Sequence, residues 1–232
     1  MLTPFGHDIW LADGTEVAAA LGFRYPTRMA VIRLPDDALF VWSPVALTSE
    51  LQADIDALGT VRHLVAPNGL HHLFIADWQR AYPDARLYAA PGLPEKRRDM
   101  AFDTVLGAAA VAAWSGAIEH VVVPGNAITT EVVFFHRASG TVIFTDLLQQ
   151  FPPRWFPGWR GIVARWDGMV GPQPSVPRKF RVAFTDRRAA RAALARILAW
   201  PVERVLMAHG TPVTTNANAC LREAFDWLTT RG

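Results

Sequence analysis

Four polar side chains in this sequence each follow an apolar run, and their residue types suit metal binding. They are His71, His72, Asp146 and His209. Three imidazoles and one carboxylate form a good ligand set for Zn²⁺ or Fe²⁺. Each side chain comes at the carboxyl end of a predicted strand, where layered α/β folds collect ligand-binding groups. If these strands lie in sheets that pack together, the four side chains can meet at one edge, and we predict a metal site there.

The two adjacent histidines lie where a buried strand is followed by a helix. Pro67–Gly69 forms the predicted turn between the apolar run Val61–Val65 and a helix over Leu73–Ala81. Two imidazoles in a bend can converge on one ion, whereas neighbours in a straight strand point to opposite faces. The structural alternative is that His71 caps the helix and His72 packs against the core.

The first half of the chain is predicted to alternate strands with helices, from the spacing of its apolar residues. The strands are expected at Phe5–Leu11, Met29–Leu34, Ala38–Trp42, Val61–Val65 and Ala85–Ala89. Asp13 and Gly14 predict a turn after the first strand, and Pro35–Asp37 predicts a hairpin between the next two. A helix is expected to begin at its cap, Thr48, and to end at Gly59.

In the second half of the chain, the apolar runs and turn residues predict antiparallel strands followed by helices. Strands are expected at His120–Val123, Glu131–His136, Thr141–Thr145 and Val202–Ala208. An Ala- and Arg-rich helix is expected from its cap, Asp186, to about Ala199, and a closing helix over Ala219–Thr229. The small apolar run Ala108–Trp114 is compatible with a helix or with irregular filling.

The segment Phe151–Pro177 breaks this pattern, because it holds six prolines and three tryptophans without periodicity. A long irregular segment inside a compact domain is usually functional or disordered, and the aromatic residues argue against disorder. We expect either a lid over the site or a contact that forms a homo-oligomer. The chain is thus predicted to be one domain over residues 1–232, with an insertion at about 151–177.

Composition limits the class of protein. With 51% hydrophobic and 19% charged residues the chain is globular, and the single cysteine, Cys220, excludes an intramolecular disulfide and a thiolate-rich zinc site. No apolar run approaches the ~20 residues of a membrane span, and no signal peptide is visible, so we expect a cytoplasmic protein.

The formal net charge of +2 is unevenly distributed. Phe151–Arg196 holds nine arginines and one lysine against two aspartates. Such an excess can favour an anionic substrate or form a solvated helix face, and it is no clear signal for nucleic acid or a membrane.

Three passages and a late histidine resemble the metallo-β-lactamase superfamily, in a divergent branch of unknown function. Pro67–His72 stands where the superfamily has His-x-His-x-Asp-His, and Pro124–Ala127 stands where it has Pro-Gly-His-Thr. Ser139–Asp146 matches the turn and strand that end in its metal-bridging aspartate, and His209 matches its last histidine. The resemblance spans Phe5 to Pro212 apart from the insertion. It implies an α/β fold, a four-layer αββα sandwich of two mixed sheets flanked by helices.

The departures from the superfamily pattern imply a single metal. The ligands of its first metal position are replaced here by Pro67, Gly69 and Asn126, so that position has lost every ligand of its own. The second position keeps a full set, with His71 in place of an aspartate beside His72, Asp146 and His209. The resemblance therefore implies one Zn²⁺, or alternatively one Fe²⁺, per chain.

The predicted function is that of a mononuclear metallohydrolase which acts on a small-molecule ester, lactone, thioester or phosphoester through metal-activated water. Four protein ligands resemble a closed structural site, so catalysis needs an expanded coordination shell or an Asp146 that loosens and acts as a base. Asn126 can donate a hydrogen bond to an oxyanion or serve only as a turn residue.

The alternatives to a hydrolase are a non-catalytic, metal-stabilised binding or scaffold domain and a redox iron site. Glu131, Thr145, His7 and His120 are further polar candidates that the sequence does not rank.

Overall fold

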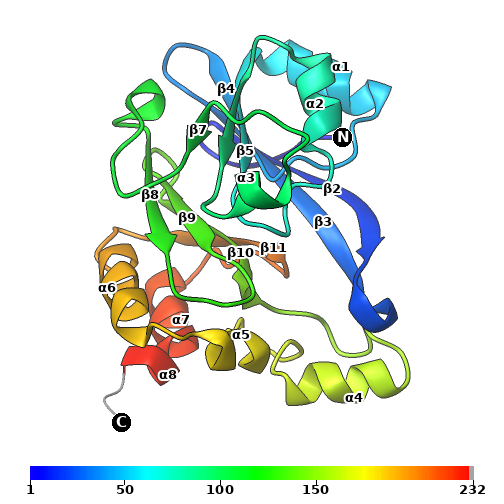
Figure 1. Ribbon diagram of the computed structural model, residues 1–232, viewed down its shortest axis with the longest axis vertical. Coiled ribbons are helices and arrows are strands. Elements are labelled where there is room, and N and C mark those ends of the chain that lie inside the picture. The colour runs from blue at the N-terminus through cyan, green and yellow to red at the C-terminus, as the bar shows by residue number, and fades with distance from the viewer. Residues whose placement is uncertain (230–232) are drawn as a thin grey trace.

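Two mixed sheets lie face to face in the computed structural model, which describes residues 1–229 (Figure 1). The first sheet has seven strands in chain order: β1 Thr3–Gly6, β2 Ile9–Ala18, β3 Arg24–Arg33, β4 Ala38–Trp42, β5 Thr60–Ala66, β6 Arg86–Ala89 and β7 Thr104–Val105. Strands β1 to β4 pair antiparallel, and β4 to β7 pair parallel. The three parallel pairs require crossovers, which contain α1 (Ser49–Leu58), α2 (Ile75–Ala81) and the short α3 (Leu93–Lys96) in turn.

The second sheet has the order β11-β10-β9-β8. Its strands are β8 Ile118–Val123, β9 Glu131–His136, β10 Thr141–Gln149 and β11 Arg204–His209. Strands β8, β9 and β10 form an antiparallel meander, and β11 returns parallel to β10. The remaining helices are α4 Trp159–Trp166, α5 Arg178–Ala183, α6 Arg187–Ile197, α7 Ala217–Ala224 and α8 Asp226–Thr229, with 3₁₀ turns at Ala20–Gly22 and Ala112–Trp114.

Three apolar clusters hold four layers together. Between the sheets, Phe40 and Trp42 of the first sheet belong to the same buried cluster as Phe134 and Leu206 of the second. The outer face of the first sheet is covered by α1 and α2 through residues such as Trp78. Helices α5 to α8 cover the outer face of the second sheet through Phe180, Leu194, Leu221 and Leu228. This arrangement confirms the predicted αββα sandwich of two mixed sheets.

Several local predictions are confirmed. The Thr48 side chain accepts a hydrogen bond from the backbone N–H of Leu51 at 3.2 Å and caps α1. Asp186 likewise accepts from the N–H of Ala189 at 2.9 Å and caps α6. Strands β3 and β4 form the predicted hairpin across residues 35–37.

The predicted turn at Asp13 and Gly14 is wrong, because β2 runs through both residues and the reversal lies before it, where Asp8 has φ 53°. Glycine at position 14 instead allows the side chains of Thr27 and Val45 to pack close to the backbone of β2. A Cβ on it would lie 2.5 Å from Thr27 Oγ1 and 2.8 Å from the Cβ of Val45. The predicted strand Phe5–Leu11 is therefore two strands.

The C-terminal prediction is also only partly right. The predicted closing helix Ala219–Thr229 is divided into α7 and α8 at Phe225, and only the end of Ala108–Trp114 forms a 3₁₀ turn. Residues 230–232 of the predicted domain lie outside the described part. Within residues 1–229 no helix has both the length and the apolar character to cross a membrane.

Candidate metal centre

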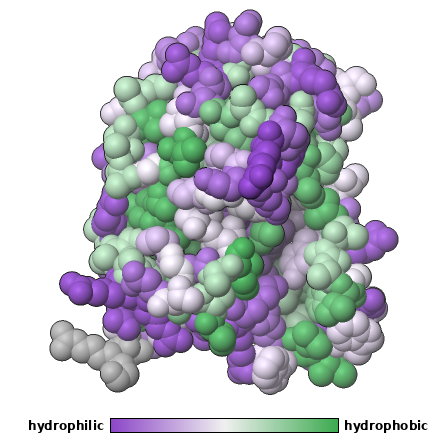
Figure 2. Space-filling view, in the orientation of Figure 1, coloured by the Kyte–Doolittle hydropathy of each residue, from purple (hydrophilic) through white to green (hydrophobic). Residues whose placement is uncertain are grey.

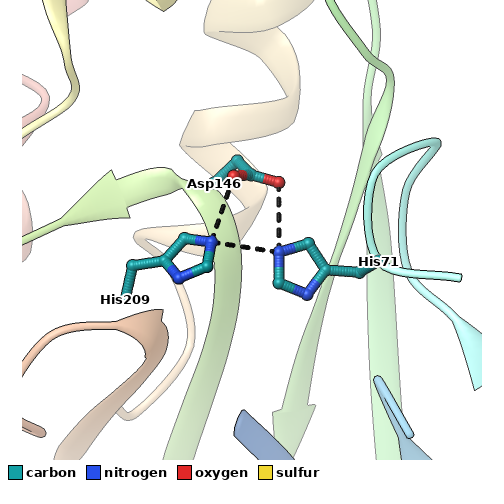
Figure 3. A group of neighbouring side chains, drawn as sticks. All are labelled: His71, Asp146 and His209. Carbon is teal, nitrogen blue, oxygen red and sulfur yellow. Dashed lines mark hydrogen bonds and ion pairs between the residues drawn. The ribbon is translucent and has the colours of Figure 1, made fainter. Parts of the chain in front are cut away.

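Three side chains from separate parts of the chain converge at one edge of the sandwich (Figure 3). His71 lies in the loop between β5 and α2, Asp146 in β10, and His209 at the end of β11. The two Nε2 atoms are 3.2 Å apart, His71 Nε2 lies 3.3 Å from Asp146 Oδ2, and His209 Nε2 lies 3.4 Å from Asp146 Oδ1. Among residues 1–229 this is the group of His, Cys, Asp or Glu residues that converges closely enough for one ion.

Each of these separations is close to the spacing of ligands around a tetrahedral metal. The two distances to Asp146 involve different oxygens, and one ligand atom from each of the three residues lies within 4.8 Å of the other two. Donors at 2.0–2.1 Å from Zn²⁺ in a tetrahedron stand about 3.3–3.4 Å from one another. Lone pairs that face one another repel unless a cation lies between them, so the donor set fits a metal ion. Three protein ligands also leave a fourth position open, which is the arrangement of catalytic rather than structural zinc.

Backbone and side-chain oxygens orient both imidazoles. His209 Nδ1 lies 3.0 Å from the carbonyl oxygen of Pro26 in β3, and because a carbonyl only accepts, Nδ1 carries the proton and Nε2 keeps its lone pair. His71 Nδ1 lies 2.9 Å from Ser43 Oγ, which can accept in the same way. Ser43 has φ 51°, an uncommon value for a residue other than glycine, and it is buried at the end of β4. Such outer partners fix the tautomer and aim of metal-binding histidines.

Asp146 lies in a bulge of β10. Pairing with β11 runs from Thr141 to Phe144 and resumes only at Gln149, opposite His209. The fully buried Glu131 carboxylate holds this bulge by accepting hydrogen bonds from the backbone N–H groups of residues 145, 146 and 147 at 2.8, 2.8 and 3.0 Å. Glu131 therefore decides how β10 presents Asp146 to the site.

Asn68 joins the loop that carries His71 to the strand that carries Asp146. Its Nδ2 donates to Asp146 Oδ2 at 2.7 Å and to Thr145 Oγ1 at 2.8 Å. Its Oδ1 accepts from the backbone N–H groups of Leu70 and His71, both at 2.8 Å. Asn68 is completely buried, so it fixes the spacing of two ligands that come from different sheets.

Burial and neighbouring charges shift the pKa values of Asp146, His209 and Glu131. Burial alone raises the pKa of Asp146, but the neighbouring His71 and His209 bring that pKa well below its ordinary value. Burial lowers the pKa of His209, and Asp146 offsets this only in part. Burial, followed by the charge of Asp146, raises the pKa of Glu131. The site thus offers an ionised Asp146 and a neutral His209 imidazole.

The structure does not bring two of the predicted site residues into this group. His72 lines the same pocket, but its Nδ1 lies 3.1 Å from Nη1 of Arg97. A guanidinium only donates, so Nδ1 is the acceptor, Nε2 carries the ring proton, and His72 in this position has no free lone pair. Asn126 donates to the carbonyl oxygen of Phe180 at 2.9 Å and accepts from the N–H of Ile128 at 3.0 Å, which favours its turn role.

The other polar candidates divide between the site and the rest of the fold. Glu131 and Thr145 contact the Asp146 network as described, whereas His7 pairs with Asp8 and His120 contacts the carbonyl oxygen of Gly107. Sequence reasoning left Glu131 unranked and read Asn68 only as a turn residue. The available signal was a single carboxylate directly before the apolar run Val132–Phe135 of strand β9.

A pocket of about 720 Å³ adjoins the three side chains and reaches the predicted insertion. Its walls include the β2–β3 hairpin and α4, and Val163, Trp166 and Met169 of the insertion line it. An aromatic cluster attaches the insertion to the hairpin: Phe23 packs on Phe156 with ring centroids 5.2 Å apart. The insertion therefore lies at the pocket, where a lid would lie. Its predicted role in a homo-oligomer stays a prediction.

Comparisons with known proteins agree with this architecture. A family model described as "Domain of unknown function (DUF4336)" matches residues 7–158. A comparison with curated proteins found no match.

Among solved structures, the metal-soaked Flv1 flavodiiron core from Synechocystis sp. PCC6803 has a TM-score of 0.66 at 11% identity over 99% of this chain, which spans 60% of that core. A metallo-β-lactamase from Pontibacter korlensis has a TM-score of 0.63 at 11% identity, covering 100% of this chain and 99% of that one. The metallo-β-lactamase FIM-1 from Pseudomonas aeruginosa, solved in its mono-zinc form, has a TM-score of 0.62 at 11% identity. That match covers 99% of this chain and 96% of the FIM-1 chain. The predicted resemblance is confirmed for the fold, which is the metallo-β-lactamase fold.

Proposed function

We propose that this chain, which belongs to the DUF4336 family of domains of unknown function, is a metal-dependent hydrolase with one metal per chain. The observation that carries the proposal is the spacing of the His71, Asp146 and His209 donors beside a pocket large enough for a small molecule. Zn²⁺ is the proposed metal, and Fe²⁺ is the alternative that the same ligands suit. The proposed substrate is a small ester, lactone, thioester or phosphoester.

The metal, when bound, would lower the pKa of a water ligand toward ~7 and polarise a carbonyl or phosphoryl oxygen. The chain's own residues position that chemistry. Asn68 occupies Oδ2 of Asp146, which leaves Oδ1 the freer oxygen to bind metal or to accept a proton. Lys96 and Lys179 line the pocket and can attract an anionic group of the substrate, although Asp167 lies 3.6 Å from Lys179 Nζ.

The residues around the site support the proposal of a single metal. Pro67 and Gly69 have no side-chain donor, and both polar atoms of the Asn126 amide bind backbone groups. Nothing at these three positions supplies a ligand for a second ion. His72 remains the predicted fourth ligand only if its ring leaves Arg97.

The test is metal content and hydrolysis of protein purified without chelator. We expect about one zinc or iron per chain by elemental analysis, and hydrolysis of some activated esters that a chelator abolishes. His209→Ala should lose both. His120→Ala is the matched control, because His120 is also buried but binds only the carbonyl oxygen of Gly107. Two metals per chain, or equal loss in both variants, would contradict the proposal.

A non-catalytic, metal-stabilised domain is the second candidate, and one observation favours it. Asp146 and His209 are only 5% and 4% exposed, which also suits a metal that stabilises the fold. In that case chelation should lower the thermal midpoint while no ester, lactone, thioester or phosphoester is hydrolysed.

A further inference from the structure

The pocket beside the metal centre has walls made mostly of carbon. Its lining includes small and large apolar side chains from the β2–β3 hairpin, the loop after β5, and α4. They include Leu21, Phe23, Leu73, Phe74, Val163 and Trp166. Its two lysines already have hydrogen-bond partners within the protein. Lys179 Nζ hydrogen-bonds to the Tyr25 hydroxyl at 3.1 Å, and Lys96 Nζ donates to the carbonyl oxygen of Gly69 at 2.5 Å.

Exposed hydrophobic residues gather at this pocket. Eleven large hydrophobic side chains are exposed within residues 1–229, and six of them line it. Leu73 is 55% exposed and Trp166 is 70% exposed, so the apolar wall continues from the interior to the molecular surface. Figure 2 shows hydrophobic side chains gathered at the lower right, over α4 and the neighbouring hairpin. Apolar surface concentrated at one opening marks a ligand site rather than ordinary surface variation.

We propose that this pocket binds a straight acyl chain, so that the substrates are medium-chain acyl esters or thioesters. This inference rests on the proposed function for the reaction, but the binding of the chain rests on the pocket alone. The reacting carbonyl would lie at His71, Asp146 and His209, and the chain would lie along Leu73, Val163 and Trp166. An extended alkyl group covers a wall that runs outward from the metal centre, which a compact polar substrate would leave in contact with water.

Helix α4 supplies a matched pair of variants. Ile162 and Val163 are neighbours in α4 and are 64% and 40% exposed, but only Val163 lines the pocket. Val163→Asp places a charge in the proposed chain path, whereas Ile162→Asp places the same charge outside it. Both changes occur on the same exposed helix, so they should affect folding similarly, which thermal unfolding can verify.

The experiment is calorimetric titration of the zinc-loaded protein with butanoate, hexanoate and octanoate. We expect about fourfold tighter binding for each added CH₂, with an increasingly negative heat-capacity change. Val163→Asp should reduce the octanoate-to-butanoate ratio at least tenfold, and Ile162→Asp should leave it within twofold of the unmodified protein. Octanoate that binds no tighter than butanoate, or equal loss in both variants, would overturn the inference.

A parallel assay with p-nitrophenyl butanoate and octanoate separates the two proposals. Chain-length-dependent binding without hydrolysis of either ester would refute the hydrolase and leave the acyl pocket supported. Hydrolysis that favours the shorter ester would support the hydrolase and refute the acyl pocket.

Discussion

Replacing Asn68 by alanine should weaken metal binding more than any other change outside the three ligands. The buried amide makes four hydrogen bonds of 2.7–2.8 Å, two toward Asp146 and its neighbour Thr145 and two from the backbone of the loop that carries His71. Without these hydrogen bonds, the Asp146 carboxylate and the loop that carries His71 are no longer held by the same side chain. Loss of such an outer partner typically costs 10–100-fold in metal affinity, or about 1.4–2.7 kcal/mol.

The same change should also destabilise the metal-free protein. Four hydrogen bonds at about 1 kcal/mol net each, some replaced by water in the space left behind, give an expected loss of about 2–4 kcal/mol. Urea unfolding of the metal-free protein measures this loss. Competition with a chromophoric zinc chelator measures the affinity of whatever remains folded.

Asn126→Ala is the matched control for this prediction. Asn126 is also buried and also binds backbone groups on both sides of its amide, but it does not touch a ligand. It should lower stability while leaving zinc affinity within twofold. The reasoning fails if Asn68→Ala keeps its zinc affinity, or if Asn126→Ala loses as much. The latter result would return Asn126 to the site, where the sequence first placed it.

Three further predictions follow from the contacts around the site and the core. Ser43→Ala removes the oxygen 2.9 Å from His71 Nδ1 and should weaken zinc binding about tenfold in the same chelator assay. Glu131→Ala leaves three backbone N–H groups of the β10 bulge without their acceptor, and urea unfolding should show a loss of about 3 kcal/mol or more. Burial lowers the pKa of His136 from 6.5 to about 4, so between these values the unfolded chain binds more protons than the folded one. The free energy of unfolding should therefore fall as pH is lowered from about 6.5 to 4, and less steeply in His136→Gln. An unchanged slope in that variant would show that other groups cause the decline.

Local sequence patterns alone determined much of the fold. The side chains of Thr48 and Asp186 can cap a helix because the acceptor and the N–H it binds are three residues apart. The β3–β4 hairpin is similarly encoded by a short turn between two apolar runs. The placement of polar residues after strands, together with the motifs that resemble the metallo-β-lactamase superfamily, was enough to predict the fold and its two mixed sheets.

Only the tertiary structure decided which side chains converge. Adjacent histidines look equivalent in sequence, but Ser43 Oγ lies 2.9 Å from Nδ1 of His71, whereas Arg97 donates to Nδ1 of His72. The misplaced turn at Gly14 has the same origin, since its neighbour Val45 lies far along the chain. These contacts join segments tens of residues apart, so their partners are set by sheet register and packing rather than by local preference.

The presentation of the metal ligands shows the same division. The sequence predicted that Asp146 and His209 each follow a strand. The structure has both at the site, but Asp146 lies inside β10, at its bulge, and His209 is the last residue of β11. It did not show the bulge that Glu131 holds in β10, or the Pro26 carbonyl that fixes the His209 tautomer across 183 residues of chain. The local spacing of apolar residues indicates approximately where a strand ends. The direction in which a ligand side chain points depends on hydrogen bonds from other strands, which exist only after the two sheets have packed.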